Sequence, residues 1–142
     1  MKLKIDQTHL RRFRLRAAKR APQEYIEALY GFFNKSGDVQ VTYFRRVSHV
    51  AGPAHISYNL AEWPTHLAKL KLVGAIHSHP FDPAKTYTPD CAPSEIDWEA
   101  AKDHFVLGIC VVDAPTQHGY TSKKPRTRVK WFSAKAWIQV VA

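Results

Sequence analysis

Two histidines that directly follow an apolar run are the residues with the clearest capacity for chemistry. The run covers residues 72–76 and is typical of a buried strand, and His77 and His79 come next with one serine between them. On a strand, side chains two positions apart lie on the same face. Both imidazoles would therefore reach one metal ion, and histidine nitrogen is a common zinc ligand. Histidine pairs at strand ends also occur in proteins without a metal.

A second group of polar residues, SEID at positions 94–97, opens a region with helical character. Asp97 could direct a carboxylate oxygen toward the two histidine nitrogens. Two histidines, one carboxylate and a fourth position left to water form the open ligand set of a catalytic zinc site. The pattern S-x-x-D before a helix is also a capping box, in which Asp97 would accept the backbone N–H of Ser94. The two roles are compatible, and we expect Ser94 to cap this helix.

Together, the strings HSHP at residues 77–80 and SEID at residues 94–97 resemble the signature of the JAMM (MPN-plus, JAB1/MPN/Mov34) metalloproteases. Members of that family that keep the whole motif are zinc isopeptidases acting on ubiquitin or ubiquitin-like proteins. The resemblance implies that His77, His79 and Asp97 bind Zn²⁺. It also implies an α+β fold, cytidine-deaminase-like, with a mixed, mostly antiparallel sheet flanked by helices. The chain is most similar to stand-alone prokaryotic-type members, as a single domain over residues 1–142.

The same family uses a glutamate well upstream of the histidines as general base. Residues 22–31, PQEYIEALYG, are similar to the family's PxE...G segment and place Glu24 in that position. Zinc lowers the pKa of a bound water, and a nearby carboxylate can take its proton and pass it to the leaving amine. Glu27 is the alternative base, but three residues along an extended strand it would point to the opposite face. By the same resemblance, the hydroxyl of Ser94 stabilises the oxyanion. We expect Ser78 to orient the loop and not to react.

The interval between the two motifs departs from the family pattern HxHx(7)SxxD. Fourteen residues, 80 to 93, separate His79 from Ser94, so the additional residues within 81–93 must loop out beside the metal. Cys91 lies in this loop, and a thiolate binds zinc strongly. One hypothesis is that Cys91 occupies the water position and holds the enzyme inactive; the alternative is a partly exposed loop cysteine.

The elements that must position these residues mix strands and helices. The patterns predict strands over residues 2–5, 25–33, 39–47, 55–58, 72–76, 105–112, 127–132 and 137–141. They predict helices after a cap at Asp6 or Thr8, from between Asn59 and Pro64 to about Lys69, and over 94–104. In the first helix, positions 10, 13 and 17 form an apolar stripe, while its arginines mostly face water. This mixture, with an early hairpin, favours an α+β sheet flanked by helices.

Length and composition suit one globular domain, with 142 residues of which 45% are hydrophobic. The sequence has no apolar run of about 18 residues and no apolar segment near its basic N-terminus, so we expect no membrane span, no secretory signal and a cytoplasmic location. Two cysteines are too few for a disulfide framework. Cys110 lies within an apolar run and is expected to be buried.

The chain is strongly basic, with a formal net charge of +9 and a pI near 9.7. Much of this charge lies in residues 2–20 and 123–130. A solvated basic face is favoured over specific nucleic-acid binding, because aromatic residues are not interleaved with the charge; an acidic protein partner fits equally well. The expected function is removal or maturation of a ubiquitin-like modifier, with that modifier or its conjugates as substrate. The alternatives are a DNA-associated protein similar to RadC-type relatives and a metal-free scaffold of the same fold.

Overall fold

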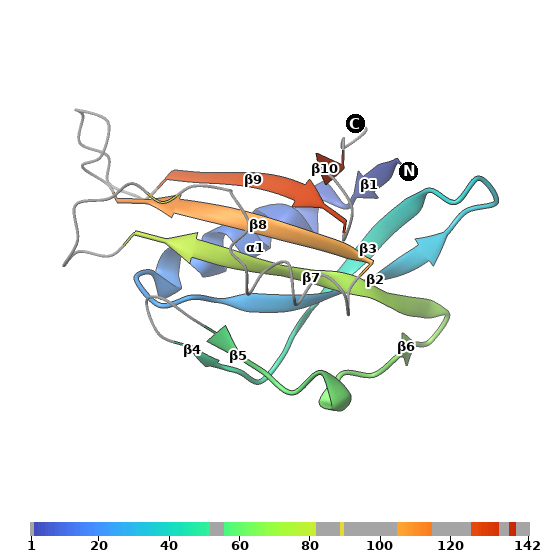
Figure 1. The fold of residues 1–142 in the computed structure, drawn as a ribbon, viewed down its shortest axis with the longest axis horizontal. Helices are drawn as coiled ribbons and strands as arrows, with labels where there is room; N and C mark the ends of the chain where they lie inside the picture. The colour runs from blue at the N-terminus through green and yellow to red at the C-terminus, as the bar shows by residue number, and fades with distance from the viewer. Residues whose placement is uncertain are drawn as a thin grey trace.

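A curled sheet of eight strands forms the centre of the computed structural model (Figure 1). The described residues are 2–51, 56–81, 89, 105–114, 126–133 and 137–138. The strands of this sheet are β1 (Leu3–Ile5), β2 (Ile26–Phe33), β3 (Val39–Arg46), β6 (His66–Leu67), β7 (Leu70–Pro80), β8 (Val106–Asp113), β9 (Arg126–Phe132) and β10 (Trp137–Ile138). A separate two-stranded sheet pairs β4 (Val50–Ala51) with β5 (Ile56–Ser57).

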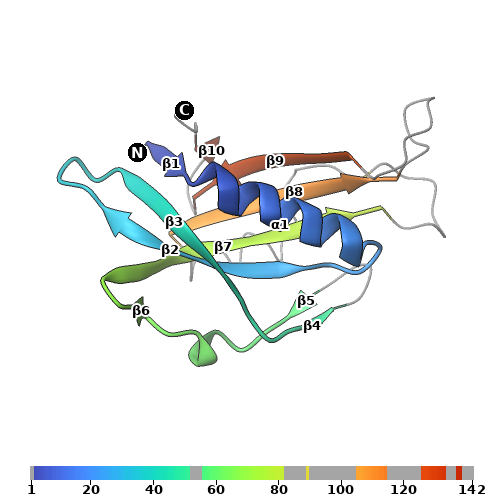
Figure 2. The same cartoon turned by 180° about the vertical axis from the view of Figure 1, so that it is seen from behind.

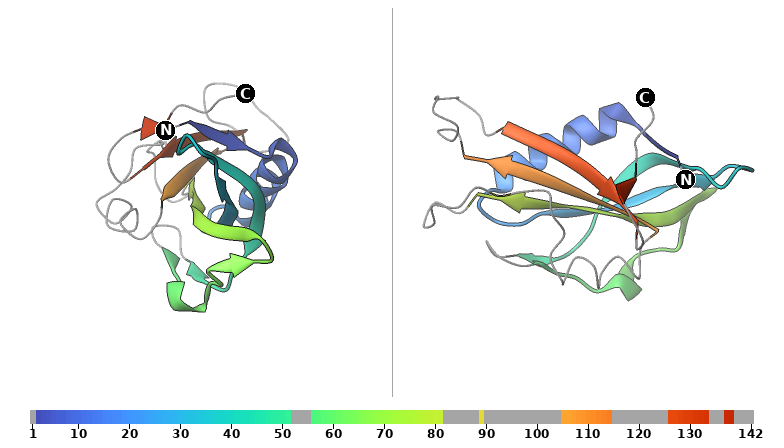
Figure 3. Two further views of the ribbon diagram at one scale, coloured as in Figure 1. Left: turned by 90° about the vertical axis from the view of Figure 1, so that its right-hand side faces the viewer. Right: turned by 45° about the horizontal axis from the view of Figure 1, so that its top comes forward.

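The strand order is β1-β3-β2-β7-β8-β9-β10, with β6 paired to β7. The pairs β1/β3 and β7/β8 are parallel, and the other pairs are antiparallel. The sheet is therefore mixed and mostly antiparallel, as the sequence predicts. Seen from its end, the sheet curls strongly (Figure 3). All eight residues of β8 are buried, which is typical of a central strand covered on both faces.

One α-helix of the described residues, α1 (Gln7–Arg20), lies across one face of the sheet (Figure 2). Asp6 caps it, since its carboxylate accepts the backbone N–H of His9 at 2.9 Å. The predicted apolar stripe of Leu10, Phe13 and Ala17 is buried and packs toward β3, β7, β8 and β9. The second flanking helix predicted over 94–104 lies outside the described residues. No helix in the described ranges is long and apolar enough to cross a membrane.

The core has two parts, one on each face of the sheet. The α1 side contains the helix stripe together with Tyr25, Leu29 and Ile76. The opposite side is a second buried hydrophobic cluster, to which α1 contributes no residue. Its members are Ile26, Ala28, Tyr30, Trp63, Ala75, Leu107, Ile109 and Phe132. Successive residues of β2 alternate between these parts, as a strand requires. This alternation decides which side chains of β2 and β7 face the helix and which face away from it.

The segment before β7 is not the helix that the sequence predicts between residues 59 and 69. It forms a 3-10 turn, η1 (Leu60–Glu62), followed by β6, which pairs antiparallel with β7. Pro64 explains the difference, because it has no N–H to donate and forces the preceding residue out of the helical region. Trp63 accordingly has extended dihedral angles. Ala68, with φ at 52°, then turns the chain back from β6 into β7.

Candidate functional site

His77 and His79 lie near the end of β7, between β2 and β8. Their Nε2 atoms are 3.2 Å apart, so the two imidazoles converge on one point. His77 pairs directly with Ile26 of β2, and directly paired residues share a face of an antiparallel sheet. Ile26 belongs to the core on the side away from α1. The histidine pair therefore faces away from the helix.

The histidine separation suits a metal ion. Two ligand nitrogens at about 2.0–2.1 Å from a tetrahedral zinc lie about 3.3 Å apart, close to the 3.2 Å observed between the Nε2 atoms. Without a metal, the same separation allows one ring N–H to donate to the other ring nitrogen. These two residues thus fit two positions of a zinc site. Among the described residues, no group of three or more His, Cys, Asp or Glu side chains gathers around one point.

The other expected members of the site fall in a part of the chain that the structure does not describe. Asp97, the expected third ligand, lies in the range 90–104, as do Ser94 and Cys91. The long interval between His79 and Ser94 also lies mostly within the undescribed ranges. Their predicted roles therefore remain predictions.

Glu24 lies two residues before β2, at the sheet end that carries the histidines. The last β2–β7 pair is Ile26 with His77, and the backbone N–H of Ser78 continues the ladder by donating to the carbonyl of Tyr25 at 2.9 Å. One further step in this register brings Glu24 opposite His79. Glu24 is half-buried. Glu24 thus lies at the same end of the sheet as the histidine pair.

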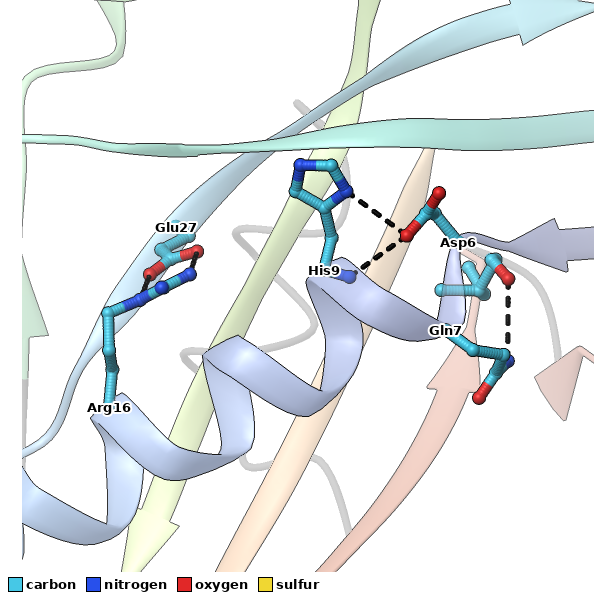
Figure 4. A network of polar contacts seen from close by, with 6 residues as sticks. Asp6, Gln7, His9, Arg16 and Glu27 are labelled. Atoms are coloured by element: carbon cyan, nitrogen blue, oxygen red, sulfur yellow. Dashed lines mark hydrogen bonds and ion pairs between the residues drawn. The ribbon is translucent and has the colours of Figure 1, made fainter.

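Glu27, the alternative base, has a different environment. Its side chain is fully buried and accepts two hydrogen bonds from Arg16 of α1, at 2.6 Å from Nε and 2.8 Å from Nη2 (Figure 4). The hydroxyl of Tyr25 donates a third hydrogen bond to Oε2 of Glu27. Glu27 therefore faces α1, on the opposite side of the sheet from the histidine pair, as the odd spacing between the two glutamates predicts.

The Arg16–Glu27–Tyr25 network raises the pKa of Tyr25 and of Arg16. Burial, followed by the hydrogen bond to Glu27, raises the pKa of Tyr25 to about 12. The hydrogen bond to Glu27 also raises the pKa of the Arg16 guanidinium. The network therefore holds a neutral Tyr25 phenol against Glu27, between α1 and β2.

Sequence reasoning missed this network because it placed the arginines of α1 mostly in water. Arg11, Arg12 and Arg14 are exposed as expected, although Arg14 also donates to the hydroxyl and the carbonyl of Thr127, at 2.7 and 2.9 Å. Arg16 is the exception, because it is half-buried. The available signal was the position of Arg16 three residues after the buried Phe13, which places it at the edge of the apolar stripe. The buried hydroxyl of Ser78 accepts the backbone N–H of Tyr25 at 2.9 Å, so it joins β7 to the segment before β2.

Comparison with known proteins bears on the fold. No model of a protein family matches the sequence, and no curated protein matches it either. A solved structure of a JAB1/MPN domain protein from Archaeoglobus fulgidus is similar over 100% of both chains, with a TM-score of 0.57 and 20% sequence identity. The chain has the JAB1/MPN fold. The fold that the sequence resemblance implied is thereby confirmed.

Two further solved structures are similar in fold to this chain. A protein from Desulfitobacterium hafniense aligns with 98% of this chain and 91% of its own, with a TM-score of 0.54 and 17% identity. A protein from Salinibacter ruber aligns with 94% of this chain and 86% of its own, with a TM-score of 0.54 and 21% identity. At these identities the likeness concerns the fold, so function has to be argued from the site.

Proposed function

We propose that this protein is a zinc-dependent isopeptidase or peptidase that removes or matures a ubiquitin-like modifier. The observation that carries the proposal is the convergence of the His77 and His79 Nε2 atoms, 3.2 Å apart, at a strand end of a JAB1/MPN fold. The register of β2 against β7, which brings Glu24 opposite His79, supports it further.

In this mechanism His77, His79 and Asp97 hold the zinc ion. The ion supplies Lewis acidity and lowers the pKa of a water in its open position. Glu24 accepts the proton of the attacking water and later delivers it to the leaving amine. The Ser94 hydroxyl donates a hydrogen bond to the oxyanion that develops on the scissile carbonyl. The leaving group is a lysine ε-amine, or the α-amine of a peptide that follows a Gly-Gly tail.

The test is cleavage of ubiquitin-like proteins that end in Gly-Gly, supplied both as linear fusions and as lysine-linked conjugates. Glu24→Gln should lower the rate by a factor of about 10² to 10⁴ while zinc binding persists. The matched control is Glu62→Gln, an exposed glutamate of η1, which should keep the wild-type rate. Mass spectrometry should find the modifier released with its intact Gly-Gly end. Equal rates for wild type and Glu24→Gln would reject the proposed base.

A DNA-associated role on the same fold is the second candidate, and the net charge of +9 favours it. In that role the protein would bind duplex or single-stranded DNA, and its affinity would fall steeply as the salt concentration rises, because binding releases counterions from the phosphates. DNA binding with a steep salt slope and no cleavage of any modifier would favour this candidate. If DNA does not bind, the same positive charge supports the proposal of an acidic protein as binding partner.

A further inference from the structure

A pocket of about 340 Å³ lies between α1 and β3. Residues of both elements line it: His9, Arg12, Arg16, Tyr43, Phe44, Arg45 and Arg46. The three helix residues follow one another at i, i+3 and i+7, so they share one face of α1. Figure 4 shows that face, with Arg16 directed at Glu27 of β2 and His9 held by Asp6. The helix and the end of β3 thus bring four arginines around one hollow.

Most of this positive charge has no acidic partner. Glu27 neutralises Arg16 through two hydrogen bonds, and Asp6 contacts Nδ1 of His9 at 3.1 Å. The side chains of Arg12 and Arg46 are exposed and make no ion pair or hydrogen bond with any part of the chain that the structure describes.

Uncompensated guanidinium groups around a hollow indicate a ligand with several negative charges. Guanidinium is planar, and its fork of N–H donors matches the oxygens of a phosphate group. The pocket volume of about 340 Å³ lies at the lower end of the range for small-molecule sites, about 300–1,000 Å³, and exceeds what one phosphate needs. Tyr43, 41% exposed, adds an aromatic ring to the wall and packs edge-on against His9.

We propose that this pocket binds an oligophosphate, either inorganic or as the phosphate tail of a nucleotide. A compact hollow suits such a ligand better than a nucleic-acid strand, which is held along an extended basic track with stacking aromatics. The pocket is on the α1 side of the sheet, whereas the histidine pair faces the other side. The oligophosphate site is therefore separate from the proposed zinc site, and it stands whether or not the peptidase proposal holds.

Calorimetric titration with inorganic tripolyphosphate, in metal-free buffer at about 0.15 M salt, tests the proposal. Wild type should bind, and Arg12→Gln combined with Arg46→Gln should weaken binding by about 100-fold, since each lost charged hydrogen bond corresponds to about tenfold or more. The matched control is Arg11→Gln combined with Lys19→Gln, which removes the same charge from exposed positions of α1 that do not line the pocket. The control should change the affinity by less than about threefold, because distant charges are screened.

Further arms identify the source of the phosphates and exclude other sites. Tighter binding of ATP than of tripolyphosphate, with the difference removed by Tyr43→Ala, would support a nucleotide; equal affinities would support a free oligophosphate. His79→Ala should bind tripolyphosphate like wild type. Three results would overturn the proposal: no binding to well-folded wild type, equal loss in both double variants, or loss only in His79→Ala. Binding of DNA but not of tripolyphosphate would overturn it as well.

Discussion

The backbone N–H of Tyr25 donates a hydrogen bond of 2.9 Å to the hydroxyl oxygen of Ser78, on the neighbouring strand. In return the backbone N–H of Ser78 donates to the carbonyl of Tyr25, also at 2.9 Å. Ser78 separates the two histidines, and Tyr25 directly follows Glu24. This pair of hydrogen bonds therefore fixes the segment that carries the candidate base against the segment that carries the candidate ligands.

Replacing Ser78 by alanine should destabilise the protein through this contact. The variant leaves the buried N–H of Tyr25 without its acceptor, which costs about 1–3 kcal/mol. Urea unfolding should show the loss, with Ser48→Ala as control because Ser48 is exposed. Equal unfolding free energies for Ser78→Ala and wild type would show that the hydroxyl does not hold the two segments together.

Removing one member of the Arg16–Glu27 ion pair should destabilise the protein, whereas replacing both members by apolar residues should destabilise it much less. Arg16→Met leaves the carboxylate of Glu27, fully buried, without its charged partner, and removing one member of such a pair costs about 3 kcal/mol. Arg16→Met combined with Glu27→Leu should regain most of that loss, because the uncompensated buried charge is gone. The control, Arg12→Met, removes an exposed arginine from the same helix. Strictly additive effects of the two substitutions would contradict a direct coupling.

Tyr25 should make stability fall at high pH. Its pKa in the folded protein is about 12, above the value of about 10 for a free tyrosine. As the pH rises, the unfolded state therefore loses the phenolic proton before the folded state does. The contribution of Tyr25 to the unfolding free energy is thus complete below pH 10 and is lost as the pH rises toward 12. The unfolding free energy of wild type should drop more steeply over this window than that of Tyr25→Phe. The control Tyr43→Phe changes an exposed tyrosine and should keep the wild-type dependence of unfolding free energy on pH. The same dependence in Tyr25→Phe would contradict a raised pKa of Tyr25.

Sequence patterns predicted well wherever local spacing determined the structure. The stripe of Leu10, Phe13 and Ala17 packs against the sheet, Cys110 is buried, and the histidines at i and i+2 converge. Each of these outcomes follows from the period of one helix or one strand. The helix expected from between Asn59 and Pro64 to about Lys69 was wrong, because the proline prevents it.

Relationships between distant segments were beyond the reach of these patterns. Nothing local in the sequence shows that Arg16 meets Glu27, because the contact depends on how α1 lies across β2. The arginine pocket has the same origin, since His9, Arg12 and Arg16 become its wall only when β3 packs beside them. For the proposed zinc site, the sequence suggests the chemical types of the ligands, and β7 brings two of the candidates, His77 and His79, together.

Metal content is the most direct test of the zinc site on which the proposed function depends. Elemental analysis of protein purified without added metal should find about one zinc per wild-type chain. The zinc should be lost in His79→Ala and in Asp97→Ala, and kept in Glu24→Gln and in His66→Ala, which changes an exposed histidine of β6. Well-folded wild type that carries no zinc even after zinc is supplied would contradict the account and favour a metal-free scaffold.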